Sequence, residues 1–549
     1  MKYPMLPIRK YISICLLLVF SHVGWSQSSG FEQIKNMEIT DLINQHLEKY
    51  FVDEPQFGHL SKVAIDAMLK ELDPYTVYYH EANMEDYKMM TTGQYGGIGA
   101  IIRTINDHVY IAEPYEGSPA FNAGLKAGDK ILEIDGKSMV NLPSNEVSSS
   151  LKGPKGTTIE IVVERVGEGE KKISVTRDEI KLPDVPYSGM IDNSIGYIKL
   201  NSFTQTAGAD VKKAFLELKE EGMKELIFDL RGNGGGLLIE AVKIVNMFVP
   251  KGQVVVNTKG RVKEENRVYT TLEEPTDLDI PLTVLIDGGS ASASEIVSGS
   301  LQDLDRAVII GQTSYGKGLV QRTYDLKYGS KMKLTIAKYY TPSGRCVQRL
   351  EYYDHLEGEK PKEISDSLLK VFKTKNGRDV IDGRGIEPDV KIEQEEYSRL
   401  TAMLFRSNII FHYATQFHNE NESITDVKNF HLSEKQYADF KKYVLEQEFS
   451  YSTASEEMLK KMKETAEEEG FYENSKEEYE ALLSKVVPSK ERDLDKFENE
   501  IKSFLENEIV SRYYFQKGRA IHSFNSDKVF EKGLELLKNK EEYNSILKK

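Results

Sequence analysis

The hydrophobic pattern changes several times along the chain. Between residues 31 and 87, apolar positions recur every three or four residues, as at Val63, Met68 and Leu72, which predicts amphipathic helices. Glycine-rich turns and short β-branched runs then continue to about residue 178, and they predict a small β-rich domain. The expected strands of this domain are residues 98–102, 109–112, 131–134 and 158–163.

Strand-like and helix-like segments alternate between residues 195 and 392, which indicates a layered α/β domain. Beyond residue 393, segments rich in Glu and Lys with helical spacing predict a solvated helical domain. The expected strands of the α/β domain are 195–200, 225–230, 282–286 and 307–310, and its expected helices are 208–221, 237–248 and 293–303.

The first 26 residues have the pattern of a secretory signal peptide. A basic segment ending at Lys10 precedes an apolar run, and Gly24 and Ser26 place small residues before the expected cleavage point. We therefore expect an exported protein without a membrane span after removal of the signal; an uncleaved anchor is the alternative. The expected domains are 1–26 (signal peptide), 27–92 (helical), 93–180 (β-rich), 181–394 (α/β core) and 395–549 (helical).

Composition and charge limit the partners. The chain has 549 residues, is 40% apolar and 29% charged, and carries a formal charge of −15, which is typical of soluble globular domains. So acidic a protein repels phosphate backbones and anionic lipids, and we expect no nucleic-acid partner. Because Cys15 lies in the expected signal peptide, Cys346 would be the one thiol of the mature chain, and no internal disulfide is expected.

Residues 282–303 carry the first candidate chemistry: a buried strand, a cluster of small residues and then a helix. Such a turn leaves free backbone N–H groups and the positive end of a helix dipole at one place. A serine there could attack a carbonyl carbon while the N–H groups bind the oxyanion. Ser290, Ser292 and Ser294 are the candidates, and a purely structural role as N-caps is the alternative.

A lysine is the more economical base for such a serine, because no histidine lies between His108 and His355. Lys317, in the glycine-containing loop 314–318, is the candidate. It must be neutral to accept a proton, so its pKa has to fall well below the ordinary lysine value, and desolvation can supply that shift. The alternative is an ordinary exposed lysine in a loop.

Motifs for cofactors and metals are incomplete. Residues 311–317 fit the GxxxxGK phosphate loop, but Gly318 stands where magnesium binding needs Ser or Thr. The glycine loop at 229–236 lacks the GxGxxG spacing of a dinucleotide site, and neither HExxH nor CxxC occurs. We therefore expect no nucleotide, no other cofactor and no metal.

Together these motifs resemble the bacterial C-terminal processing peptidases, which are serine endopeptidases with a Ser–Lys dyad and a PDZ domain. The resemblance implies an α/β multidomain protein whose core is a crotonase/ClpP-like β-superhelix with an inserted PDZ domain. It is carried in the core by residues 229–238, 288–296, 314–321, 338–348 and 383–389, and in the β-rich domain by 96–102, 117–136 and 151–157.

The resemblance also implies roles for particular residues. Ser292 would be the nucleophile, Lys317 the general base and Gln321 a residue that orients the lysine. Ala293 and one of two glycines, Gly235 or Gly236, would form the oxyanion hole, and the choice between the glycines stays open.

In the PDZ domain, the resemblance and the mechanics of peptide capture agree. Backbone amides of Gly96, Gly97, Ile98 and Gly99 would bind a terminal carboxylate, while the following strand pairs with the peptide. We therefore expect a periplasmic serine endopeptidase that captures proteins or peptides with exposed apolar C-termini, with homo-oligomerisation possible. The alternatives are a non-catalytic PDZ scaffold or chaperone that presents clients to another protease, and a crotonase-like acyl-CoA enzyme.

Overall fold

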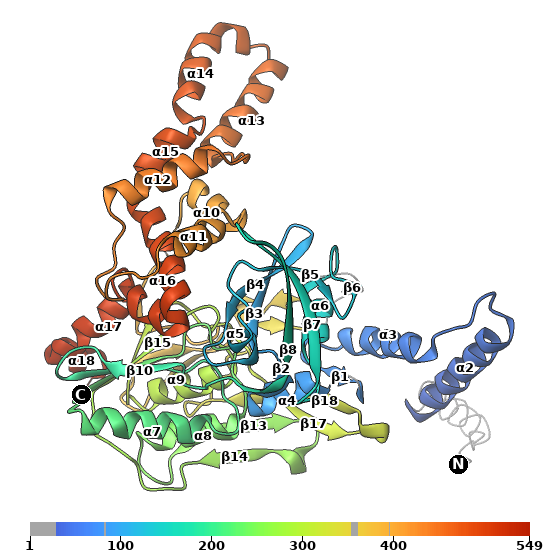
Figure 1. Ribbon diagram of the computed structural model, residues 1–549. Coiled ribbons are helices and arrows are strands. Elements are labelled where there is room, and N and C mark those ends of the chain that lie inside the picture. Colours follow the sequence, from blue (N-terminus) through green and yellow to red (C-terminus); the bar gives the residue numbers. More distant parts are fainter. Residues whose placement is uncertain (1–28, 82–83, 353–360, 395, 549) are drawn as a thin grey trace, which may run out of the picture. The chain divides into compact units, whose positions relative to one another are not determined.

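The computed structural model describes residues 29–81, 84–352, 361–394 and 396–548. Its contacts separate one unit that ends at Pro74 from a second that begins at Tyr75. The first unit contains the helices α2 (Ser29–Tyr50) and α3 (Phe57–Lys70), which confirms the helical pattern predicted there (Figure 1). The signal peptide predicted at residues 1–26 lies outside the described residues.

The β-rich segment forms a sheet in the order β3-β4-β5-β7-β8, with β6 (Lys137–Ser138) paired to β5. All four predicted strands are present. The first begins at Ala100 rather than Ile98, because Gly96 and Gly97 belong to β2 and pair with β9. The bounds are β2 Gln94–Gly97, β3 Ala100–Ile105, β4 His108–Pro114, β5 Lys130–Ile134, β7 Thr158–Arg165, β8 Gly169–Thr176 and β9 Asp178–Lys181, with α5 Pro119–Asn122 and α6 Ser144–Leu151.

The core sheet has the order β10-β11-β12-β15-β16-β23 and is parallel from β11 to β23. The strands and helices predicted for it are confirmed, with ends that differ by one or two residues. The strands are β10 Tyr187–Met190, β11 Ile195–Lys199, β12 Glu225–Asp229, β15 Leu282–Ile286, β16 Val308–Gly311 and β23 Val390–Lys391, and the helices are α7 Ala207–Glu220, α8 Leu238–Asn246 and α9 Ala293–Asp303.

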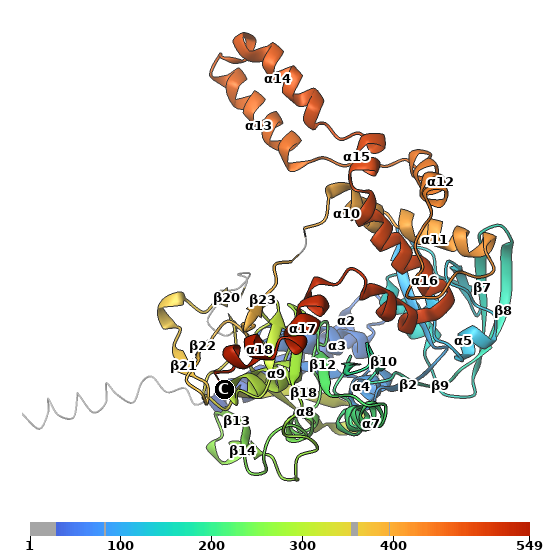
Figure 2. The ribbon, with the colours of Figure 1, turned by 90° about the vertical axis from the view of Figure 1, so that its left-hand side faces the viewer.

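Both faces of this sheet are buried, as the burial of all five residues of β15, four of them apolar, indicates. On one face, Phe228 and Val284 pack into a core shared with α7, α8 and α9. On the other, Ile227 and Leu285 pack against Phe530 of α17 (Lys528–Lys538). Figure 2 shows α17 and α18 (Lys540–Ile546) beside this sheet. Helices α17 and α18 therefore cover the second face of the core sheet.

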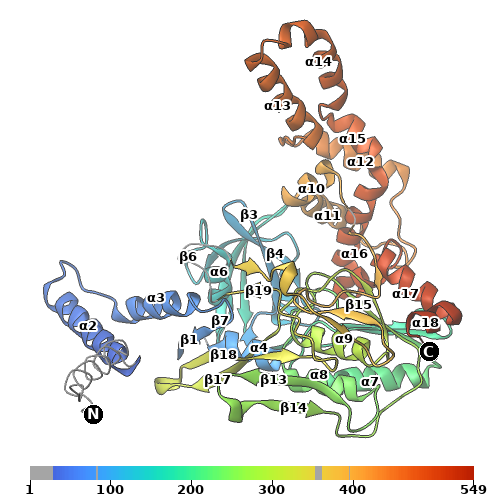
Figure 3. The same ribbon diagram turned by 180° about the vertical axis from the view of Figure 1, so that it is seen from behind.

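A second sheet, seen from behind in Figure 3, has the order β1-β18-β13-β14, and β17 pairs with β18 along most of its length, from Lys331 to Lys338. Its strands are β1 Val77–Tyr79, β13 Val254–Gly260, β14 Arg267–Thr270, β17 Leu319–Asp325 and β18 Lys331–Tyr340. Two short hairpins follow, β19–β20 (Leu350–Glu351, Lys362–Glu363) and β21–β22 (Val371–Lys373, Asp379–Ile381). The superhelical winding expected of the core stays a prediction.

All elements after residue 398 are helices, which confirms the helical character predicted there. Helices α13 and α14 pack side by side as a hairpin. Across the described ranges, no helix combines the length and the apolar character needed to cross a lipid bilayer. The bounds are α10 Arg399–Arg406, α11 Ile409–Glu420, α12 Glu434–Leu445, α13 Ala454–Glu468, α14 Tyr472–Val486, α15 Lys490–Lys496 and α16 Glu498–Ser523, and a further helix, α4 Met84–Thr92, precedes the PDZ sheet.

The ion pair between Arg345 and Asp303 lies inside the core, with side chains only 1% and 0% exposed and an N–O distance of 2.8 Å. We expect Arg345→Met to lower the free energy of unfolding by about 3–5 kcal/mol, because it leaves the Asp303 carboxylate buried without its positively charged partner. The measurement is the midpoint of urea denaturation. In the control, Arg322→Met removes a half-exposed pair with Glu265 and should change stability little; equal losses in the two variants would contradict the prediction.

Candidate active site

Ser292 lies at the turn between strand β15 and helix α9, as the N-cap of the helix. Its φ is 56° and its ψ −109°, a conformation that residues other than glycine rarely adopt and that costs about 1–3 kcal/mol. The buried neighbours Ala291 and Ala293 hold the turn in place. A strained turn of this kind presents a serine side chain at the mouth of a helix, and Ser292 lines a cavity of about 1340 Å³.

The other two candidate serines have structural roles. Ser290 is fully buried and its hydroxyl donates to the carbonyl oxygen of Leu230 at 2.9 Å. Ser294 is also fully buried, and its hydroxyl donates to the carbonyl oxygen of Asn233 at 2.8 Å. Both hydroxyls tie the glycine loop to the turn, and of the three serines only Ser292 lines the cavity.

Lys317 lines the same cavity, in the loop between β16 and β17. Its Nζ lies 4.1 Å from the centre of the Tyr75 ring. The Tyr75 hydroxyl lies within hydrogen-bond distance of the hydroxyls of Tyr315 and Tyr352. Burial raises the pKa of Tyr75, so its side chain stays neutral. An aromatic face attracts an ammonium ion, so the contact with Tyr75 favours the charged form of the Lys317 amine.

A fully buried carboxylate, Glu295, joins the serine turn to the lysine loop. Its Oε1 accepts from the Ser314 hydroxyl at 2.6 Å and from the Gly316 amide at 2.7 Å. Its Oε2 accepts from the amides of Ser292 at 2.8 Å and Lys317 at 2.9 Å. One oxygen thus holds the backbones of both predicted catalytic residues.

Burial raises the pKa of Glu295, while its four hydrogen-bond donors oppose the shift by favouring the carboxylate. Glu295 is not among the site residues predicted from the sequence. Its position three residues after Ser292 is the spacing of a capping box, and this spacing could have indicated it. The spacing alone does not reveal that the carboxylate also reaches a loop more than 20 residues away.

Gln321 also lines the cavity, from strand β17. Its Nε2 donates to the hydroxyl of Thr335 on β18 at 3.2 Å, so the neighbouring strand holds its amide. Its predicted action on Lys317 stays a prediction.

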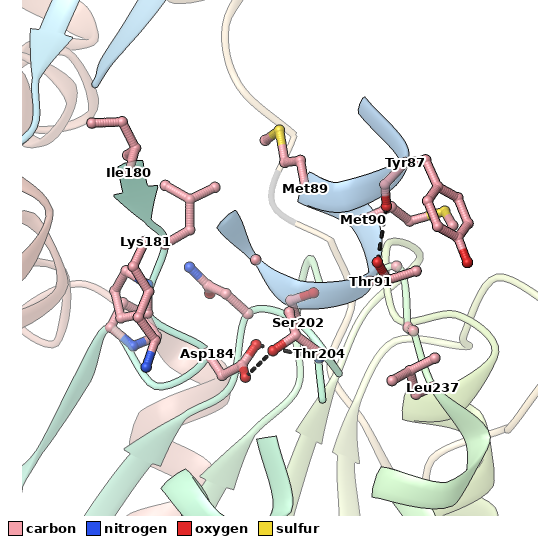
Figure 4. Close-up of a pocket in the computed structure, with 18 of the residues that line it drawn as sticks. Tyr87, Met89, Met90, Thr91, Ile180, Lys181, Asp184, Ser202, Thr204 and Leu237 are labelled. Carbon is pink, nitrogen blue, oxygen red and sulfur yellow. Dashed lines mark hydrogen bonds between the residues drawn. The ribbon is translucent and has the colours of Figure 1, made fainter. Parts of the chain in front are cut away.

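The remaining walls of the cavity come from distant parts of the chain. Figure 4 shows Met89 and Met90 of α4 above the cavity and Ile180 and Lys181 of β9 at its other side. At the floor, Asp184 accepts the Thr204 hydroxyl at 2.5 Å, and burial raises the pKa of this acid. The cavity is therefore lined by both apolar and charged side chains.

The glycine loop packs directly behind Ser292. A Cβ at Gly235 would lie 2.8 Å from the Ser292 Cβ and 2.9 Å from the Ala293 nitrogen, and its φ of 99° also demands glycine. The Gly235 amide donates to Asn233 Oδ1 at 2.9 Å. Because this amide is engaged, the geometry favours Gly236 with Ala293 as the pair that would bind an oxyanion.

A buried charge network anchors the start of this loop. Arg231 donates to Asp229 at 2.6 Å and to Asp527, in the C-terminal helices, at 2.7 Å. Burial alone would raise the pKa of Asp229, but the charges of Arg231 and Lys199 lower it. The glycine loop is thus held by the last part of the chain.

The predicted carboxylate-binding segment of the PDZ domain lies at the junction of β2 and β3. The Gly96 amide already donates to Glu85 Oε2 at 2.8 Å, and Ile98 is buried in the domain core. Strand β3 is the last strand of its sheet and α6 packs against it, so its outer edge can accept a peptide strand. The carboxylate roles of Gly96, Gly97, Ile98 and Gly99 stay predictions.

Comparisons with known proteins agree on the class. Three family models match this chain: peptidase family S41 at residues 194–355, a PDZ domain at 110–165, and the C-terminal helical domain of PDZ-proteases at 400–537. A CtpA-like serine protease of Staphylococcus aureus is 33% identical over 363 residues, which cover 65% of this chain and 71% of that protein. Its counterpart in Staphylococcus epidermidis is 31% identical over 397 residues, with 71% and 72% covered.

Among solved structures, a photosystem II D1 C-terminal processing protease is 27% identical, with a TM-score of 0.37, over 64% of this chain and 86% of that chain. The protein is a serine-type peptidase with a PDZ domain. It belongs to peptidase family S41, the C-terminal processing peptidases. This confirms the predicted class and fold, and it removes the scaffold and acyl-CoA alternatives.

The contact between Gly235 and Ser292 predicts that Gly235→Ala lowers kcat by at least about 100-fold, because the added methyl group displaces the serine turn and the predicted oxyanion donors. Cleavage of unfolded casein measures the effect, with circular dichroism as a check on folding. The matched control is Gly234→Ala, where the new Cβ meets nothing within 4 Å. Full turnover by the Gly235 variant would refute the proposed packing.

Proposed function

We propose that this protein is a periplasmic endopeptidase that cleaves proteins near their C-termini with Ser292 as nucleophile and Lys317 as general base. The observation that carries the proposal is the shared cavity: both residues line it, and Glu295 binds both backbones. The strained conformation of Ser292 supports its role, since such strain collects at functional positions. Export rests on the signal-like pattern of the first 26 residues.

The reaction follows from these positions. Lys317 Nζ, neutral when substrate has displaced water, accepts the proton of the Ser292 hydroxyl as Oγ attacks the peptide carbonyl carbon. The amides of Ala293 and Gly236 donate to the oxyanion. Collapse of the intermediate breaks the C–N bond, and the protonated Lys317 gives its proton to the leaving amine. Lys317 then accepts a proton from the water molecule whose oxygen attacks the ester carbon. As the bond from that carbon to Ser292 Oγ breaks, Lys317 returns the proton to Oγ, and the new C-terminus leaves.

Substrate capture belongs to the PDZ domain in this proposal. An extended peptide would pair with the outer edge of β3, with its terminal carboxylate at the amides that lead into this strand. The same peptide chain would continue toward the cavity, whose wall includes Ile180 and Lys181 of β9. Substrate recognition and cleavage would therefore use adjoining surfaces.

The dyad is tested by Ser292→Ala and Lys317→Ala, each of which should lower casein cleavage by at least about a thousandfold, because the nucleophile or its base is lost. Lys317→Arg should be as inactive, since an arginine stays charged. Binding of a fluorescent C-terminal peptide should persist in all three. Ser484→Ala and Lys485→Ala on α14 are the controls and should cleave casein at the normal rate. Cleavage at the normal rate by Ser292→Ala would exclude the dyad.

C-terminal recognition is tested with one peptide in two forms, with a free terminal carboxylate and with a terminal amide. Amidation removes the charge that the backbone amides would bind, so KM should rise about tenfold or more while kcat changes little. Acetylation of the N-terminus of the same peptide is the control and should leave KM unchanged. An equal KM for the free and amidated peptides would show that the protein does not recognise the terminal carboxylate.

A further inference from the structure

Three side chains with metal-binding chemistry meet in the C-terminal helical region, away from the catalytic cavity. His431 precedes α12, while Glu506 and His522 both belong to α16. His431 Nδ1 lies 3.2 Å from Glu506 Oε2, and His522 Nε2 lies 3.7 Å from the same oxygen. The carbonyl oxygen of Phe430 lies 3.0 Å from His522 Nε2.

A break in α16 creates this cluster. Glu506 and His522 are 16 positions apart, so a straight helix would separate them by about 24 Å. Phe515, between them, has φ 53° and ψ −155°, a conformation that reverses the path of the chain and is rare outside glycine. The strained backbone at Phe515 therefore lets the Glu506 and His522 side chains come together.

The atoms that converge are electron-pair donors. Asn507 Oδ1 lies 2.9 Å from His522 Nδ1, so it can accept a proton on that nitrogen, and in this tautomer the lone pair of the ring lies on Nε2. Glu506 Oε1 accepts the Leu432 amide at 2.8 Å, so Oε2 is the oxygen that faces the histidines. In this tautomer Nε2 points a lone pair at a carbonyl and a carboxylate, and a bound cation would stabilise that arrangement.

We propose that His431, Glu506 and His522, with the Phe430 carbonyl as fourth ligand, bind a divalent transition-metal ion of the zinc type. Imidazole nitrogens and a carboxylate oxygen are the ligands such an ion takes. Ligands about 2.0–2.2 Å from a tetrahedral zinc lie about 3.3–3.5 Å from each other, and the separations of 3.0, 3.2 and 3.7 Å bracket this range. The contact of His522 Nδ1 with Asn507 is the outer-shell bond that orients a ligating histidine.

The ion would clamp the two arms of α16 on either side of the break. That break presents Phe515, Gln516 and Lys517 to the catalytic cavity, and the Phe515 ring lies 5.8 Å from the ring of Phe121 in the PDZ domain. The metal site thus stabilises the segment through which the helical region contacts both the PDZ domain and the cavity.

The test is titration of zinc chloride into the untagged full-length protein after EDTA treatment and removal of the chelator, followed by calorimetry. We expect one zinc ion per chain and an upward shift of the melting temperature. His431→Ala should weaken binding by at least tenfold; because this side chain is 65% exposed, the change leaves the core intact. The matched control is the exposed His59→Ala, which should bind zinc as the unchanged protein does.

Glu506→Gln keeps the side-chain shape and provides a second variant with the same expected loss of affinity. Absence of zinc binding to the unchanged protein would overturn the proposal. Binding of equal strength in the His431 and His59 variants would overturn it too, since the ion would then lie elsewhere.

Discussion

The catalytic centre depends on one buried carboxylate. Glu295 accepts two hydrogen bonds at each oxygen, from the turn that carries Ser292 and from the loop that carries Lys317. Removing a charge from water is unfavourable unless hydrogen-bond donors surround it. The charged form of Glu295 is therefore stable in the interior only when all four of its donors are in place. The same bonds that make the buried carboxylate tolerable fix the distance between the two loops.

The cavity around these residues is assembled from separate regions of the chain. Helix α4, strand β9, the glycine loop and the break in α16 each supply part of its wall. No single region encloses the site, so its shape depends on how the PDZ domain and the C-terminal helices pack on the core. In the proposed mechanism a substrate peptide would lie among these regions, which would link substrate capture to the geometry of cleavage.

Two residues with strained backbone conformations line this cavity. Ser292 and Phe515 both have positive φ values without being glycine, and both line the cavity. Strain of this kind persists only where surrounding contacts determine the conformation. At Ser292 these contacts are the buried alanines and Glu295; at Phe515 they include the aromatic contact with Phe121.

Sequence alone determined the strands and helices of the core, because buried strands and amphipathic helices produce characteristic local patterns of hydrophobic residues. It also selected Ser292 and Lys317 as candidates, through their motifs and the family resemblance. Only the tertiary structure revealed the contacts of Glu295 with the lysine loop, the packing of Phe530 on the core sheet, and the meeting of His431 with α16. Each of these joins residues far apart in the chain, and local patterns carry no information about which distant segments fold against each other.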